Sequence, residues 1–156
     1  MSPPRSPPDL AGAADARAGM MTDFVAEIAP QTDAIAALTE RVMAHLADCG
    51  VDSRAAHHVA LVLDELLTNV AMHDGLSAGP VAIRVGVSAA RVSGEVVDGG
   101  KPFDPSLERQ SIAAEGVERP PGGLGLLLVR RLTEGLVYER VGARNRTTFS
   151  ICRAAD

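Results

Sequence analysis

The hydrophobic period changes several times along this chain of 156 residues, and the order of these changes limits its fold most. Alternating apolar residues predict a strand over residues 24–28, which Pro30 ends. Spacings of three and four residues then predict two consecutive helices. Their apolar stripes are Ile35, Leu38, Val42 and Leu46 in the first helix, and Val59, Val62, Leu63, Leu66, Leu67 and Val70 in the second.

The ends of these helices carry capping signals. Thr32 or Asp33 is expected to cap the first helix at its start, and Gly50 is expected to stop it. The second helix is expected to open at Asp52 or Ser53 and to run to about residue 73. The stretch 74–80 is a loop by composition.

The second half of the chain alternates again. The expected elements are strands over 81–87 and 92–97, a long loop over 99–123, a helix over 124–133, a strand over 136–141, and a last strand from 145 or 146 that places Thr147, Phe149 and Ile151 on one face. This order predicts an α+β fold, a two-layer sandwich with helices on one face of a mixed, mainly antiparallel sheet.

The first 21 residues differ in composition from the rest. They contain four of the ten prolines and few large apolar side chains, so their burial cannot offset the entropy of ordering them. We expect a disordered tail over 1–21 and a single domain over 22–153. Met20 and Met21 stand at this boundary, and the position of the true translation start is left open between them and Met1.

Composition excludes several classes of partner. The formal net charge is −5 and aromatic residues make up 3% with no tryptophan, which argues against direct binding of nucleic acid. No apolar run is long enough to cross a membrane. Cys49 and Cys152 are isolated in the sequence, as is typical of a reducing compartment, so a cytoplasmic location is expected.

The chain has a single lysine, Lys101, among fifteen lysines and arginines. Pro102 follows it, so a phosphate-binding loop that ends in Gly-Lys-Ser/Thr is excluded. The run 81–84 resembles the lysine-bearing strand of protein kinases with Arg84 in place of the lysine, but no His-Arg-Asp loop accompanies it. Any nucleotide site here must therefore work without a P-loop lysine.

Three places in the sequence have a chemical character, and the first is on the second helix. Glu65, Asn69 and His73 are four residues apart, which stacks them on one side of the helix next to its buried face. A carboxylate there can act as a general base, and an amide oxygen suits Mg²⁺. The alternative is an ordinary solvated stripe of an amphipathic helix.

The other two places contain glycine. Asp98 ends a valine-rich strand and precedes Gly99 and Gly100, so a flat ring that donates an amine, such as adenine, can approach it; the alternative is a simple turn. The run 122–125 opens a helix with exposed N–H groups that suit phosphate; the alternative is a flexible loop before a helix.

In this order, the three places resemble the N, G1 and G2 boxes of the GHKL superfamily of Bergerat-fold ATPases. The resemblance is closest to the anti-sigma-factor serine/threonine kinases of bacterial partner-switching systems. It covers residues 22–152. It rests on the runs Glu65-Leu66-Leu67-Thr68-Asn69-Val70-Ala71-Met72-His73, Pro102-Phe103-Asp104-Pro105 after Asp98, and Gly123-Leu124-Gly125-Leu126.

The resemblance implies a role for each matched residue. Glu65 would be the catalytic base, Asn69 the Mg²⁺ ligand and Asp98 the residue that binds adenine. The implied ATP-binding residues are Asn69, His73, Asp98, Gly100, Phe103, Gly122, Gly123, Leu124, Gly125, Leu126 and Thr147. Thr147 or Thr148 matches the threonine that family members place near the adenine pocket, and Arg146 departs from the family pattern by replacing the usual preceding glycine. Arg109 or Arg119 is a candidate for contact with the γ-phosphate, although neither matches a family position.

The function implied is an ATP- and Mg²⁺-dependent serine/threonine kinase that phosphorylates a small anti-anti-sigma (STAS) protein and binds a sigma factor or similar regulator. The alternative is a nucleotide-binding sequestration module of a partner switch with little or no kinase activity. The presence of Glu65 favours catalysis. Homodimers are common among the similar kinases, and the first strand is a candidate interface.

Overall fold

The computed structural model describes residues 20–107 and 123–154. The described elements, in chain order, are β1 (Met20–Ile28), α2 (Thr32–Asp48), α3 (Ser53–His73), the 3₁₀ helix η1 (Gly75–Ala78), β2 (Val81–Ser88), β3 (Arg91–Asp98), α4 (Gly123–Leu132), β4 (Glu134–Val141) and β5 (Arg144–Cys152). This is the order predicted from the sequence, with η1 added inside the loop expected over 74–80. β1 begins two residues before the expected start of the domain, and the rest of the predicted tail lies outside the described residues.

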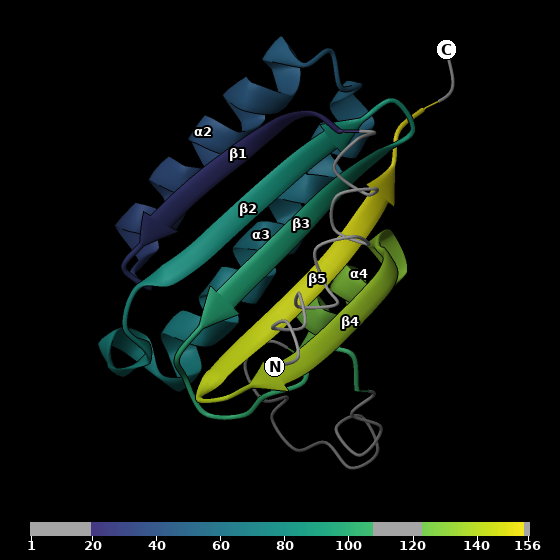
Figure 1. The fold of residues 1–156 in the computed structure, drawn as a ribbon. Helices are drawn as coiled ribbons and strands as arrows, with labels where there is room; N and C mark the ends of the chain where they lie inside the picture. Colours follow the sequence, from purple (N-terminus) through teal and green to yellow (C-terminus); the bar gives the residue numbers. More distant parts are fainter. Residues whose placement is uncertain (1–19, 108–122, 155–156) are drawn as a thin grey trace, which may run out of the picture.

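The strands form one sheet in the order β1-β2-β3-β5-β4, and the three α-helices cover one face of it (Figure 1). Helix α3 lies in the middle of the helical layer and contacts both α2 and α4. The predicted two-layer α+β fold is therefore confirmed. None of the helices in the described part of the chain is long and apolar enough to cross a membrane.

All four strand pairings in the described residues are antiparallel. The sequence analysis expected a mixed, mainly antiparallel sheet, so its antiparallel part is confirmed and its mixed part is wrong. The reason lies in the order of the strands. β3 and β4 are joined through one helix and run in the same direction, which would make a parallel pair if they were neighbours. β5 is inserted between them and runs the opposite way to both.

The core lies between the sheet and the helices. The apolar stripe of α2 is buried as predicted, at Ile35, Leu38, Val42 and Leu46. The stripe of α3 is buried from Val59 to Leu67, whereas Val70 is half-buried. Every second residue of β2 faces these helices, at Val81, Ile83, Val85 and Val87.

The helix ends match the sequence signals in part. Asp52 caps α3 as predicted, and its carboxylate accepts a hydrogen bond from the Ala55 N–H at 3.0 Å. The cap predicted for α2 is wrong: the capping position is Gln31, whose side chain makes no capping hydrogen bond. Gly50 follows the end of α2 with φ +71°, a conformation that favours glycine.

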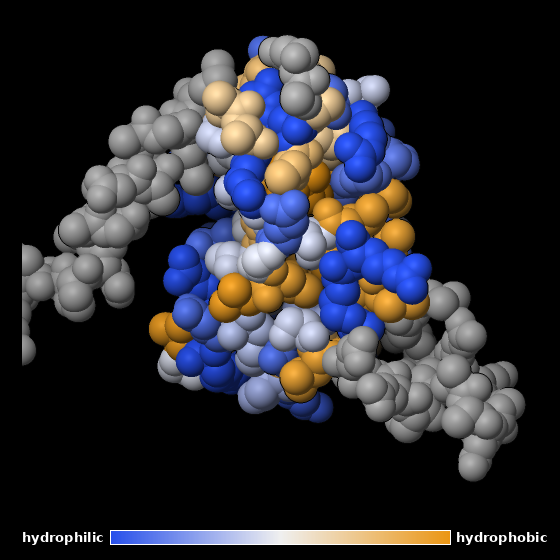
Figure 2. Space-filling view, turned by 90° about the vertical axis from the view of Figure 1, so that its right-hand side faces the viewer, coloured by the Kyte–Doolittle hydropathy of each residue, from blue (hydrophilic) through white to orange (hydrophobic). Residues whose placement is uncertain are grey.

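The side of the molecule that carries β4 is more exposed than the rest of the sheet. Val137 and Val141 of β4 and Leu128 of α4 are exposed there. Figure 2 views this side and shows hydrophobic residues interspersed with hydrophilic ones. The uncovered face of the sheet also carries ion pairs between strands, in which Arg146 of β5 contacts Glu95 at 2.9 Å and Glu139 at 3.5 Å.

Candidate functional site

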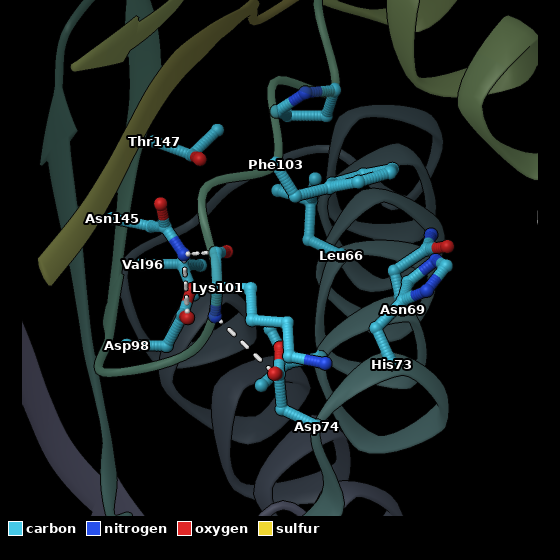
Figure 3. A pocket seen from close by; sticks show the side chains of 12 residues that line it. Leu66, Asn69, His73, Asp74, Val96, Asp98, Lys101, Phe103, Asn145 and Thr147 are labelled. Carbon is cyan, nitrogen blue, oxygen red and sulfur yellow. Dashed lines mark hydrogen bonds between the residues drawn. The ribbon is translucent and has the colours of Figure 1, made fainter. Parts of the chain in front are cut away.

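A pocket opens between the C-terminal half of α3, the end of β3, the segment after it and the start of β5 (Figure 3). Four polar residues are buried among the described residues, namely Asn69, Asp98, Asn145 and Thr147, and all four line this pocket. Burying polar groups is costly unless they are hydrogen-bonded, so their concentration at one place points to a binding site. The full lining is Leu66, Asn69, Val70, His73, Asp74, Val96, Asp98, Lys101, Phe103, Pro105, Asn145 and Thr147.

Helix α3 supplies one wall of the pocket. The Asn69 side chain is 5% exposed, and its Nδ2 donates a hydrogen bond to the Glu65 carbonyl oxygen at 2.7 Å. Within the described residues, Asn69 Oδ1 accepts no hydrogen bond and is available to a ligand. Val70 also lines the pocket, which explains why it is not fully buried in the core.

His73 and Phe103 meet at the mouth of the pocket. Their ring centroids are 4.8 Å apart, and the ring planes are inclined by 31°. The contact joins the end of α3 to the segment after β3, and Figure 3 shows both rings on the same side of the cavity. Two residues that the sequence analysis assigned separately to the same site therefore lie in contact.

Glu65 lies one helical turn before Asn69 and is not among the residues that line the pocket. Its carboxylate packs against the backbone of Gly125 in the first turn of α4, so closely that a methyl group on Gly125 would overlap it. Partial burial raises the pKa of the Glu65 carboxyl above its usual value near 4.5, and the negative charge of Asp64 adds to this effect. A raised pKa suits a carboxylate that must accept a proton.

Asp98 ends β3 at the opposite wall. Its Oδ1 accepts hydrogen bonds from the Gly100 N–H at 2.9 Å and from Asn145 Nδ2 at 3.0 Å. Gly100 is buried, and a Cβ there would overlap the Asp74 carboxylate. A side chain at this position would therefore displace the Asp74 carboxylate from the backbone of Gly100.

Strand β5 places the two threonine candidates on opposite faces of the sheet. Thr147 is 7% exposed, faces the helical layer and lines the pocket. Thr148 is the next residue in an extended strand and therefore points to the opposite face of the sheet.

The glycine-rich run begins α4, with Gly123 as the first residue of the helix and Leu124 as the second. Gly125 contacts Glu65, and Leu126 is 4% exposed and buried. Gly122, Arg109 and Arg119 lie outside the described residues.

Sequence reasoning missed two polar residues of the site, Asp74 and Asn145. Asp74 caps the end of α3, and its Oδ1 accepts a hydrogen bond from the Lys101 N–H at 3.2 Å. Asn145 shares the core-facing period of β5 with Thr147, Phe149 and Ile151, so a polar residue in a buried register was the available signal. Lys101, the single lysine of the chain, also lines the pocket.

The side chains of the pocket offer few ligand atoms for a metal ion. No group of three or more histidine, cysteine, aspartate or glutamate side chains in the described ranges could hold a metal ion alone. Asn69 offers a single amide oxygen, and Mg²⁺ in nucleotide sites is commonly held by one or two protein ligands together with phosphates and water. One amide oxygen is therefore compatible with a metal whose other ligands are phosphates and water.

Comparison with known proteins identifies relatives of this chain. The family model described as "Histidine kinase-like ATPase domain" matches residues 28–151. The serine/threonine-protein kinase BtrW of Bordetella bronchiseptica is 30% identical over 101 residues, which cover 63% of this chain and 71% of that protein.

Two solved structures share the fold. The structure of the RsbU and RsbW domains of Rv1364c from Mycobacterium tuberculosis matches with a TM-score of 0.62 and 11% identity, over 86% of this chain and 34% of that one. This chain therefore spans about a third of that larger protein. The SiaB-SiaC complex from Pseudomonas aeruginosa matches with a TM-score of 0.50 and 17% identity, over 92% of this chain and 98% of the matched chain.

Proposed function

Because the chain belongs to the histidine kinase-like ATPase family, we propose that it is an ATP-dependent serine/threonine protein kinase of a partner switch. Its substrate would be a hydroxyl group on a small anti-anti-sigma (STAS) protein. The observation that carries this proposal is the gathering of the four buried polar residues of the described chain around one pocket. Glu65 lies one helical turn before one of them, Asn69, and its carboxylate packs against the start of α4.

The adenine ring would bind between β3 and β5. Asp98 would accept a hydrogen bond from the exocyclic amine, and Gly100 lets the base approach the backbone. Thr147 offers a hydroxyl on the same wall, and the paired rings of His73 and Phe103 close the side of the pocket toward α3. These roles combine a hydrogen-bond acceptor with apolar surface, which is how small-molecule sites distinguish their ligands.

The phosphates would extend from the pocket toward α4. Asn69 Oδ1 would hold Mg²⁺, which neutralises phosphate charge when it is bound. The backbone N–H groups at Gly122, Gly123, Leu124 and Gly125 would face the phosphates, because the first turn of a helix leaves its N–H groups without partners. Leu126, which is buried, would anchor this turn to the core.

Glu65 would act as the general base. Its carboxylate takes the proton of the substrate hydroxyl while that oxygen forms a bond to the γ-phosphorus, and the bond from that phosphorus to the leaving ADP oxygen breaks. Its location on α3, beside Asn69 and against the start of α4, is where an attacking hydroxyl would meet the end of the phosphate chain.

The relatives support the choice of partner. BtrW is named as a serine/threonine kinase, and the matched Pseudomonas structure is of a complex between two proteins. We propose that this chain also binds a sigma factor or a similar transcription regulator and acts in the cytoplasm. We further propose that it pairs with a second copy through β1, which is one of the two edge strands of the described sheet.

The first test mixes the purified chain, Mg-ATP and a STAS protein encoded beside it, and measures phosphate incorporated into that protein. Glu65→Gln should reduce transfer by at least about 100-fold, while ATP affinity stays close to that of the wild type. Glu40→Gln, on the exposed side of α2, is the matched control and should leave transfer unchanged. Binding of ATP and the partner without any transfer would instead identify a sequestration module.

The second test concerns the site itself. Asn69→Ala removes the amide oxygen proposed to hold Mg²⁺, so Mg-ATP binding measured by calorimetry should be abolished. Ser93→Ala, on the uncovered face of β3, should bind as the wild type does. Intact ATP affinity in the Asn69→Ala variant would overturn the site assignment.

A further inference from the structure

Asn145 occupies an unusual position for a polar residue in a sheet. It is 3% exposed, and its Cα is paired with Asp98 on β3 and with Arg140 on β4. It therefore lies in the middle of three adjacent strands at the edge where the candidate nucleotide pocket opens (Figure 3).

The amide of Asn145 uses both of its ends. Nδ2 donates hydrogen bonds to Asp98 Oδ1 at 3.0 Å and to the Lys101 carbonyl at 2.8 Å, and lies 3.4 Å from the Gly100 carbonyl. Oδ1 accepts hydrogen bonds from the Tyr138 hydroxyl at 2.5 Å and from Arg140 NH1 at 3.0 Å. All the acceptors lie at one end and all the donors at the other, which fixes the orientation of the amide.

The segment from Asp98 to Lys101 is held from three elements. Asn145 holds it from β5, Arg140 NH1 donates to the Gly100 carbonyl at 2.8 Å from β4, and Asp74 accepts from the Lys101 N–H at the end of α3. Residues of β5, β4 and the end of α3 therefore hold this segment in its conformation.

These contacts also determine what Asp98 can offer a ligand. Both hydrogen bonds that Asp98 accepts from the described residues go to Oδ1, from Gly100 and Asn145. Oδ2 accepts none within the described residues and is left as the acceptor for a ligand. An acceptor fixed in this way favours a base edge that presents an amine over one that presents a carbonyl.

We propose that Asn145 is a positioning residue that aligns the Asp98 carboxylate and the Gly100–Lys101 backbone for adenine, and so sets the preference of the pocket for ATP over GTP. Tyr138 and Arg140 hold the amide of Asn145 in the required orientation. This inference rests on the proposed nucleotide-binding function and adds a determinant of base selection to it.

The test measures affinity for Mg-ATP and Mg-GTP by calorimetry with the full chain. Asn145→Asp keeps the size of the side chain but replaces the donor with a second carboxylate facing Asp98 and two carbonyls. It should weaken ATP binding about tenfold or more and reduce the ratio of ATP to GTP affinity. A purely structural role would weaken both nucleotides equally and leave the ratio unchanged.

Tyr138→Phe provides a second variant, because Tyr138 is not among the described residues that line the pocket, and its hydroxyl donates a hydrogen bond to Asn145. It should reduce the ratio of ATP to GTP affinity as Asn145→Asp does, but by a smaller factor. If Asn145→Asp does not fold, the result for Tyr138→Phe decides the test. Ser93→Ala is again the control. An unchanged ratio of ATP to GTP affinity in a folded Asn145→Asp, or in Tyr138→Phe if Asn145→Asp is unfolded, would overturn the role of Asn145. A wild-type chain that binds neither nucleotide would overturn the proposed function as well.

Discussion

Glu65 is held between two helices, and this placement determines its protonation. Its pKa is raised because partial burial disfavours the charged form and because Asp64 is next to it. In a carboxyl group whose pKa is higher in the folded than in the unfolded chain, deprotonation destabilises the fold. This loss of folding stability is absent below pH 4.5, where the carboxyl is protonated in both states, and it is fully present above the raised pKa.

The first prediction follows from this sign. Glu65→Gln should be more stable than the wild type at neutral pH, and the difference should disappear as the pH falls below about 4.5. Chemical denaturation at pH 7 and pH 4 measures it, with Glu40→Gln as the control. The kinase activity of the wild type should rise with pH through the raised pKa, because a general base must be deprotonated. Equal stability of Glu65→Gln and wild type at pH 7 would contradict the burial cost.

Gly125 provides the second prediction. A methyl group there would overlap the Glu65 carboxylate, which is the flexible end of its side chain and can move away. Gly125→Ala should therefore keep or slightly raise the melting temperature, since alanine favours a helix by about 1 kcal/mol over glycine. It should also lower phosphate transfer about tenfold or more, because the base is displaced. Full activity in a folded Gly125→Ala would show that this contact does not position the base.

At the scale of elements, α3 connects the core to the site and is fixed at its start by Asp52. One oxygen of Asp52 accepts from the Ala55 N–H, and the other accepts from the Ala154 N–H at 3.0 Å, which ties the start of α3 to the residues after β5. The hydrogen bond from Ala154 is the largest cause, followed by that from Ala55, of the lowered pKa of the Asp52 carboxyl.

The third prediction is that Asp52→Ala lowers the melting temperature at pH 7 by about 2–4 °C. A lowered pKa means that this contribution is present above pH 3.8 and is lost as the pH falls through the folded-state value. Thermal melts at pH 7 and pH 3 should show the difference narrowing at the lower pH. Asp48→Ala, at the exposed end of α2, should cause no loss; a similar loss there would mean that the cap is not the cause.

At the scale of the whole molecule, one core supports both layers. Leu67 of α3 is fully buried in the core between the sheet and the helices, whereas the neighbouring residues Leu66 and Asn69 line the pocket. The fourth prediction is that Leu67→Ala lowers the free energy of unfolding by about 2–5 kcal/mol. Leu76→Ala, at a position 64% exposed in η1, should change it by less than about 0.5 kcal/mol. Guanidinium denaturation compares them, and a loss below about 1 kcal/mol in Leu67→Ala would place Leu67 outside the main core.

Local signals in the sequence predicted the elements well, because hydrophobic period and capping act over a few residues. The buried stripe of α2 and the capping of α3 by Asp52 are confirmed. The cap of α2 was wrong by one or two positions because its start is not fixed by a side-chain hydrogen bond. Val70 was predicted to be buried, but it lies where the core gives way to the pocket, a boundary that helical period does not mark.

The sequence by itself determined the α+β order, the helical line of Glu65, Asn69 and His73, and the acidic end of a strand at Asp98. Each depends on residues close together in the chain. Only the tertiary structure decided that β5 lies between β3 and β4, which makes the sheet antiparallel throughout its described pairings. The same insertion brings Asn145 against Asp98, residues 47 positions apart in sequence. Strand order is set by the packing of whole elements against one core, so no local pattern could have shown that contact.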